Sequence, residues 1–110
     1  MYKLIAYWTA PKPDQTDAFE QEYWDTHIPL AEAVPKLNRL VLTRTADGLE
    51  GGEPGFYRIA ELVWDSADDF ASCAASPEWL ALREDAGRLV EKYGVVLSAG
   101  LGDENVHVQA

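Results

Sequence analysis

His27 is the side chain of this sequence best suited to acid–base chemistry. Histidine is the side chain whose ordinary pKa lies nearest neutrality, and the other histidine, His107, lies close to the C-terminal end, where chains usually fray. A positioned acid–base group typically accelerates proton transfer by about 10² to 10⁴. We therefore expect His27 to act as a general base or acid, taking a proton from a carbon beside a carbonyl or from a phenol.

A proline two residues later predicts where His27 lies in the fold. Pro29 lacks an amide hydrogen and its ring disfavours helical geometry at Ile28, so a helix beginning near Asp14 should end at about His27. The alternative role of His27 is structural, since a histidine at a helix C-terminus can bond the last free carbonyls.

Further candidates could hold or wall a small molecule. Tyrosine hydroxyls stabilise an enolate oxygen and tryptophans flank an aromatic ring, which gives a predicted substrate-binding set of Tyr7, Trp8, Tyr23, Trp24, Tyr57, Glu61 and Trp79. Glu20 or Glu61 could orient the imidazole, whereas Asp25 faces elsewhere, because residues two apart on a helix do not meet. Core packing of the aromatic residues is the competing interpretation. Three arginines could bind a carboxylate or pair with nearby acids, namely Arg39, Arg44 and Arg58.

Composition excludes several classes of partner and site. With 19 acidic and 9 basic residues the net charge is −10, which repels a nucleic-acid backbone. Cys73 is the only cysteine, so no Cys-x-x-Cys site exists, and we expect no metal, no cofactor and a reducing compartment such as the cytoplasm. No export signal or long apolar segment is visible, so no membrane contact is expected.

Hydrophobic periodicity predicts a single α+β domain over residues 1–110. Strands are expected at residues 2–9, 37–45, 56–64 and 95–101. Helices are expected at 14–27, after a cap at Asp65 or Ser66, and from Pro77 to Gly94, with a short helical piece at 29–34. Val106 and Val108 could prolong an edge strand. The order strand, helix, strand, strand, helix, strand is the ferredoxin-like βαββαβ pattern, a four-stranded antiparallel sheet with helices on one face.

The first and third predicted strands are apolar on both faces. In the first, Leu4 and Ala6 oppose Ile5 and Tyr7. Helices on one side of the sheet leave the second face uncovered, and an apolar patch of that size normally marks an interface. We therefore expect a homodimer that forms through the sheet faces.

The chain resembles the EthD-like family of the dimeric α/β-barrel superfamily over most of residues 2–100. The resemblance rests on Tyr23-Trp24-x-x-His27-x-Pro29-Leu30, on Tyr57-Arg58-Ile59-Ala60-Glu61-Leu62, and on Ser76-Pro77-Glu78-Trp79. It implies a dimer whose sheets form a barrel, with a pocket between helices and sheet in each subunit. Relatives in that superfamily include cofactor-free cyclases, isomerases and monooxygenases of aromatic or polyketide-like substrates, haem-binding branches and pathway accessory proteins.

Together these points predict a cofactor-independent enzyme that moves a proton with His27 on an aromatic or polyketide-like small molecule. Isomerisation, cyclisation, dehydration and a related oxygenation are the candidate reactions. The main alternative is an accessory protein that binds a pathway intermediate without transforming it. Haem binding through His27 is a weaker alternative.

Overall fold

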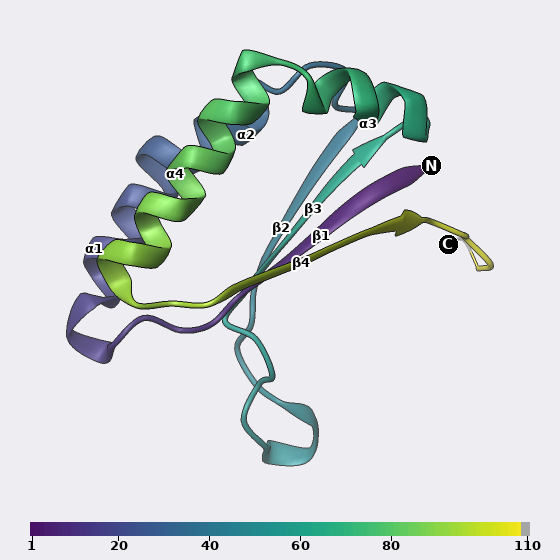
Figure 1. Ribbon diagram of the computed structural model, residues 1–110. Coiled ribbons are helices and arrows are strands. Elements are labelled where there is room, and N and C mark those ends of the chain that lie inside the picture. The colour runs from purple at the N-terminus through teal and green to yellow at the C-terminus, as the bar shows by residue number, and fades with distance from the viewer. Residues whose placement is uncertain (109–110) are drawn as a thin grey trace.

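The computed structural model describes residues 1–108 and has the predicted α+β, ferredoxin-like architecture. Four antiparallel strands form one sheet in the order β2-β3-β1-β4. Figure 1 shows the helices lying together on one face of this sheet. The strands are β1 (Tyr2–Trp8), β2 (Arg39–Arg44), β3 (Arg58–Trp64) and β4 (Leu97–Asp103), and the helices are α1 (Thr16–Glu22), α2 (Ile28–Glu32), α3 (Ala67–Ala74) and α4 (Pro77–Tyr93).

Strand register decides which side chains face the helices. Ala6 of β1 lies opposite Ala60 of β3 and Ala99 of β4, and because side chains alternate along a strand, the even-numbered residues of β1 and β3 form the helix-facing surface. Trp8 is only 2% exposed there. The odd-numbered residues, including Ile5 and Tyr7, form the opposite, helix-free face.

The expected helix end at His27 is wrong, because the chain remains helical through Pro29. Residues Tyr23–His27 form a π-helical turn between α1 and α2, and Ile28 has helical φ/ψ of −64° and −40° and donates its amide to the carbonyl of Tyr23. The wider π turn shifts the hydrogen-bond register by one residue, which accommodates the proline ring and its missing amide. Such single turns are frequently found at functional sites.

Serine residues cap both α3 and α4: Ser66 is one of the two caps expected for α3, and Ser76 is the cap expected for α4. The Ser66 hydroxyl accepts from the Asp69 amide at 3.1 Å, and the Ser76 hydroxyl accepts from the Trp79 amide at 3.1 Å. A side-chain oxygen at these positions satisfies an amide that has no partner within the helix. Ser66 thus fixes the start of α3 and Ser76 the start of α4.

Gly94 ends α4 in the left-handed conformation, with φ of 67°. Gly94→Ala is expected to lower the free energy of unfolding by about 1 kcal/mol, because an alanine is strained at this φ and the space around the site is open. Gly87→Ala is the matched control within α4, where a Cβ also meets nothing, and it is expected to stabilise by about 0.5 to 1 kcal/mol. Urea denaturation measures both, and equal effects of the two substitutions would contradict the assignment.

The remaining differences lie at the strand ends and in the tail. The short helix α2 begins one residue earlier than expected, and β4 runs later, to Asp103. Val106 and Val108 do not extend a strand, since residues 104–108 have no regular structure. None of the helices among residues 1–108 has the length and apolar character needed to cross a bilayer.

Candidate functional site

A small apolar cavity lies between the sheet and the helices. Its volume is about 40 Å³, room for a few water molecules. The floor comes from the helix-facing side chains of the strands and the walls from α2, α4 and the π turn. Most of its lining is aliphatic or aromatic, and the groups that bring polar chemistry to it are His27, Tyr23 and Arg83.

His27 lies in the wall of this cavity and is 6% exposed. Its Nδ1 atom lies 2.8 Å from Oδ2 of Asp85, a residue of α4 that is itself only 8% exposed. A carboxylate accepts a hydrogen bond from a ring N–H, so this contact assigns the proton to Nδ1 in the neutral imidazole and leaves Nε2 as an acceptor. The alternative in which His27 bonds the last carbonyls of its own helix is not what the structure shows.

Burial lowers the pKa of His27 from its ordinary 6.5. The hydrogen bond and negative charge of Asp85 raise the pKa, but by less than the lowering effects together. The positive charges of Arg88 and Arg83 also lower it. The imidazole is therefore neutral at pH 7. A neutral ring with Nδ1 held by a carboxylate is the form that can accept a proton at Nε2.

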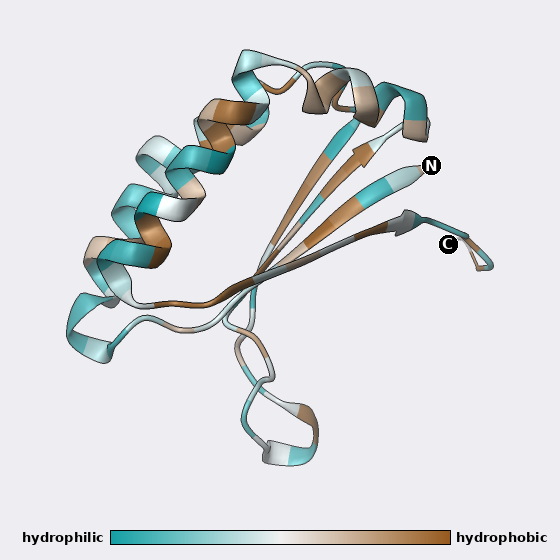
Figure 2. Cartoon of the chain, in the orientation of Figure 1, coloured by the Kyte–Doolittle hydropathy of each residue, from teal (hydrophilic) through white to brown (hydrophobic). Residues whose placement is uncertain are grey.

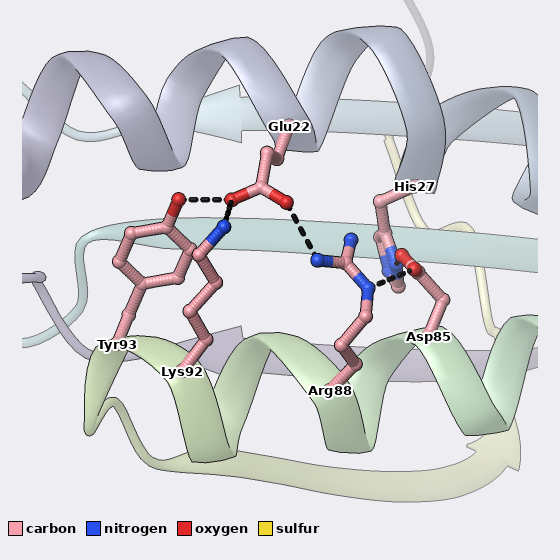
Figure 3. Close-up of polar contacts among 6 residues, drawn as sticks. All are labelled: Glu22, His27, Asp85, Arg88, Lys92 and Tyr93. Atoms are coloured by element: carbon pink, nitrogen blue, oxygen red, sulfur yellow. Dashed lines mark hydrogen bonds and ion pairs between the residues drawn. The ribbon is translucent and has the colours of Figure 1, made fainter.

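A chain of charged groups continues from Asp85 across the seam between α1 and α4 (Figure 3). Arg88 donates from Nε to Oδ1 of Asp85 at 2.9 Å and from a terminal nitrogen to Glu22 at 2.6 Å. Glu22 also accepts from the Tyr93 hydroxyl and pairs with Lys92 at 2.9 Å. The Tyr93 hydrogen bond, with the contacts of Lys92 and Arg88, lowers the pKa of Glu22 to about 2. Glu22 stays ionised and anchors Arg88, which in turn fixes the carboxylate that faces His27.

Tyr23 has a buried hydroxyl that meets no hydrogen-bond partner among the described residues. Its ring is fully buried and stacks on His27 with centroids 5.8 Å apart and an interplanar angle of 26°. Burial raises the pKa of Tyr23 to about 12, so the hydroxyl keeps its proton and remains a donor. Buried polar groups are normally satisfied, so the Tyr23 hydroxyl is a free donor that a bound oxygen atom could use.

A second ion cluster lies at the edge of the helix-facing surface and is structural in character. The buried Arg58 donates from Nε to Glu20 at 3.0 Å and from a terminal nitrogen to its other oxygen, while the Tyr57 hydroxyl donates to Glu20 at 2.8 Å. Arg44 also pairs with Glu20 at 3.5 Å. Glu20 is therefore committed to Arg58 and does not orient His27.

The predicted site residues divide into two groups in the structure. Those that line the cavity with His27 are Trp8, Tyr23 and Trp79. Those that lie outside it are Tyr7, Trp24, Tyr57 and Glu61.

Each outlying residue has another environment. Tyr7 and Glu61 occupy odd-numbered positions and so face away from the helices, where Tyr7 stacks on Phe56 at 4.3 Å and Glu61 pairs with Lys3 at 2.9 Å. Trp24 is 47% exposed and Tyr57 is engaged with Glu20. None of the four therefore lines the cavity in which His27 lies.

Asp85 is the site residue that the sequence analysis missed. It lies 58 positions from His27 in the sequence, and helical spacing cannot indicate which helix will pack against which. A signal was present, since Asp85 falls on the inner face of α4 beside Leu82, Ala86 and Leu89. A carboxylate on an apolar stripe normally needs a partner. Within residues 1–108, no three His, Cys, Asp or Glu side chains lie close enough to hold a metal ion.

Comparison with protein families gives one match, to the EthD domain, over residues 12–92. The chain is a member of the EthD family. A curated relative is an uncharacterised 11.0 kDa protein from the thcB–thcC intergenic region of Rhodococcus erythropolis, 30% identical over 78 residues that cover 71% of this chain and 73% of the relative.

Solved structures agree with the EthD assignment. An EthD family protein from Bacillus halodurans superposes with a TM-score of 0.81 at 31% identity, covering 96% of this chain and 99% of that one. A variant of SnoaB, a cofactor-independent oxygenase from Streptomyces nogalater, gives a TM-score of 0.66 at 19% identity, covering 99% and 97%. The second likeness shows the shared fold alone. This EthD protein thus has a fold that small-molecule enzymes also use, and a shared fold does not specify the reaction.

Proposed function

We propose that this EthD protein is a cofactor-independent enzyme that moves a proton within a small aromatic or polyketide-like carbonyl compound, with His27 as the general base. The observation that carries the proposal is the buried His27–Asp85 pair in the wall of an apolar cavity, with Nδ1 and Oδ2 2.8 Å apart. A neutral imidazole held in one tautomer by a buried carboxylate is the arrangement that general-base catalysis requires.

In the proposed step, Nε2 of His27 takes the proton from a carbon beside the carbonyl. The C–H bond breaks, its electron pair moves toward the carbonyl oxygen as an enolate forms, and the imidazolium is stabilised by Asp85. The Tyr23 hydroxyl donates to the enolate oxygen, since it is buried, protonated and without a partner among the described residues. Returning the proton from Nε2 to a different atom completes an isomerisation, or prepares a cyclisation or dehydration.

The size of the cavity favours a small substrate. At about 40 Å³ it is far below the roughly 300 to 1,000 Å³ of pockets that enclose drug-sized ligands. A single ring can enter when wall side chains shift, whereas a large fused ring system requires a much greater rearrangement. Trp8 and Trp79 are the aromatic walls against which such a ring would pack.

The test is deuterium exchange in D₂O, followed by proton NMR on phenylpyruvate, phenylacetone and acetylacetone. The enzyme hypothesis expects saturable loss of the signal of the hydrogens beside the carbonyl, for at least one compound, faster than in buffer. Exchange no faster than with the His27→Gln protein, for all three, would refute the enzymatic proposal.

A binding role without turnover is the alternative function, and the same cavity favours it. In that case a ligand would protect the protein against thermal unfolding while no exchange occurred. Replacing His27 by phenylalanine would then preserve binding, because the ring mainly supplies an apolar wall.

We also propose that the protein forms a homodimer through the helix-free face of its sheet. Ile5, Ile59 and Val41 lie on that face by strand register and are only partly buried in one chain. Figure 2 shows apolar colour along the strands, although helices cover just one side of the sheet. Surfaces of this kind normally become interfaces. We further propose a cytoplasmic location, which the unpaired Cys73 supports because free thiols persist in a reducing compartment.

Ile59→Glu is expected to convert the dimer to a monomer at low micromolar concentration, because it places a charge on an inner strand of the helix-free face proposed as the interface. Sedimentation velocity measures the change. Leu80→Glu is the matched control, because Leu80 is also an exposed apolar side chain but lies on α4, in the layer of helices and not on the helix-free face, and the dimer should persist. A wild-type protein that sediments as a monomer would contradict the interface.

A further inference from the structure

Arg83 brings a formal positive charge to the lining of the cavity. It lies on α4, close to His27, Trp79 and Leu82 in the same wall. Because Arg83 is an exposed residue in a lining that is otherwise largely buried, we place it at the rim. Its side chain thus reaches both the cavity and solvent.

The arginines expected from sequence to bind a carboxylate are already paired. Arg39 lies 3.0 Å from Glu104, and Arg44 and Arg58 both bind Glu20. Arg88 is shared between Glu22 and Asp85. Arg83, by contrast, forms no ion pair or side-chain hydrogen bond with any residue among 1–108. The chain has 19 acidic residues, and Arg83 differs from the four arginines above in having no acidic partner among the described residues.

The sequence around Arg83 keeps it free. Residues three and four positions away on a helix are its neighbours, and here these are Leu80, Ala86, Trp79 and Gly87, none of them acidic. The guanidinium therefore has no intrahelical partner and presents a planar fork of donors, the geometry that matches a carboxylate. Its charge also reaches into the site, since it contributes, after burial, to lowering the pKa of His27.

We propose that Arg83 binds a carboxylate of the substrate at the cavity rim, so that the site takes a small aromatic or unsaturated keto acid. This inference rests on the proposed function and narrows its substrate class. The carboxylate pairs with Arg83 while the apolar part of the molecule enters between Trp8 and Trp79 and brings its carbonyl toward His27. A net charge of −10 on the chain disfavours anions in general, so a local cation is the means by which an acid would be admitted here.

The test compares an acid with a neutral ligand of the same shape, benzoate against benzamide, in protein labelled with ¹⁵N. Binding is followed through the indole N–H signal of Trp79 and the imidazole signals of His27. Benzoate is expected to bind about 2- to 5-fold more tightly than benzamide, the range that an ion pair with a solvent-exposed arginine supplies. The preference should shrink as salt is added.

Three variants distinguish a specific effect of Arg83 on benzoate binding from the effect of net charge. Arg83→Gln should remove the preference for benzoate, and Arg83→Lys should keep part of it, since lysine retains the charge without the planar fork. Lys12→Gln is the matched control: it changes the net charge equally, and Lys12 does not line the cavity. Equal affinities for benzoate and benzamide in the wild type, no binding of benzoate up to its solubility, or an unchanged preference in Arg83→Gln would each overturn the proposal.

The deuterium-exchange assay can test the carboxylate site and the enzymatic role separately. Phenylpyruvate carries a carboxylate and phenylacetone does not. Faster exchange of phenylpyruvate that depends on Arg83 would support both proposals. Arginine-dependent binding of benzoate without any exchange would support the carboxylate site and refute the enzymatic proposal. An equal acceleration over buffer for phenylacetone and phenylpyruvate would overturn the role of Arg83 alone.

Discussion

His27→Gln is expected to slow proton exchange by about 10² to 10⁴, the range that a positioned acid–base group supplies. Glutamine has nearly the reach of histidine, and its amide can still donate to Asp85, so the buried carboxylate keeps a partner. Because the substitution removes only the group that accepts a proton, binding of benzoate should change little. A variant that folds, as shown by circular dichroism, and still exchanges at the wild-type rate would rule out His27 as the base.

Asp85→Asn tests whether the tautomer of His27 matters, because the imidazole ring itself is kept. The asparagine amide would present a donor to Nδ1 and favour the tautomer with the proton on Nε2, which cannot accept a proton from substrate. The same logic operates wherever a carboxylate orients a catalytic imidazole. We expect a loss of exchange approaching that of His27→Gln, and a shift of the His27 ¹⁵N signals to the opposite tautomer. Unchanged tautomer signals would mean that Asp85 does not orient the ring.

The pH dependence of exchange follows from the direction of the shift at His27. Since burial lowers its pKa below the ordinary 6.5, the neutral, base-competent form predominates at pH 7. Activity should therefore be level above neutrality and fall only as pH drops through the lowered pKa. An NMR titration of His27 and a pH–rate profile should give the same midpoint. A midpoint above 6.5 would show that Asp85 outweighs burial.

The sequence predicted the scaffold well where local rules act alone. Helix α4 begins after Ser76 and ends at Gly94, as expected, because capping and left-handed turns depend on single residue types. The continuous helix through Pro29 was not predicted, since a π turn resolves a clash that the proline rule treats as a helix end. Local sequence carries no direct signal for that alternative.

The site was predicted only in part for a different reason. His27 could be found because its chemistry is unusual in this composition, but Asp85 and Arg83 belong to a helix whose register against the π turn depends on packing across the whole layer. Tyr7 and Glu61 were predicted to bind substrate but lie on the opposite face of the sheet from the cavity. Alternation along β1 and β3 puts them on one face, yet sequence alone did not say that the helices cover the other.

Glu20→Ala is expected to lower the free energy of unfolding by about 3 kcal/mol, the largest effect on stability that we predict here. The Arg58 side chain is 5% exposed and that of Glu20 is 16% exposed, so removing the carboxylate leaves a charged guanidinium buried without its ion-pair partner, which typically costs about 3 to 5 kcal/mol. The partial exposure of Glu20 places the estimate at the lower end. Urea denaturation measures the change.

Two comparisons show whether the loss arises from the unpaired charge. Asp17→Ala removes an exposed carboxylate from the first turn of the same helix and should cost less than about 1 kcal/mol. A double variant, Glu20→Ala with Arg58→Met, removes both charges, and it should recover part of the stability lost in the single variant, because an apolar side chain of similar length needs no partner. A double variant less stable than Glu20→Ala would show that the Arg58 side chain stabilises the fold by more than its ion pair. The cation–π contact of Arg58 with Tyr23, 4.6 Å from the ring centroid, would then be the larger contribution of this arginine.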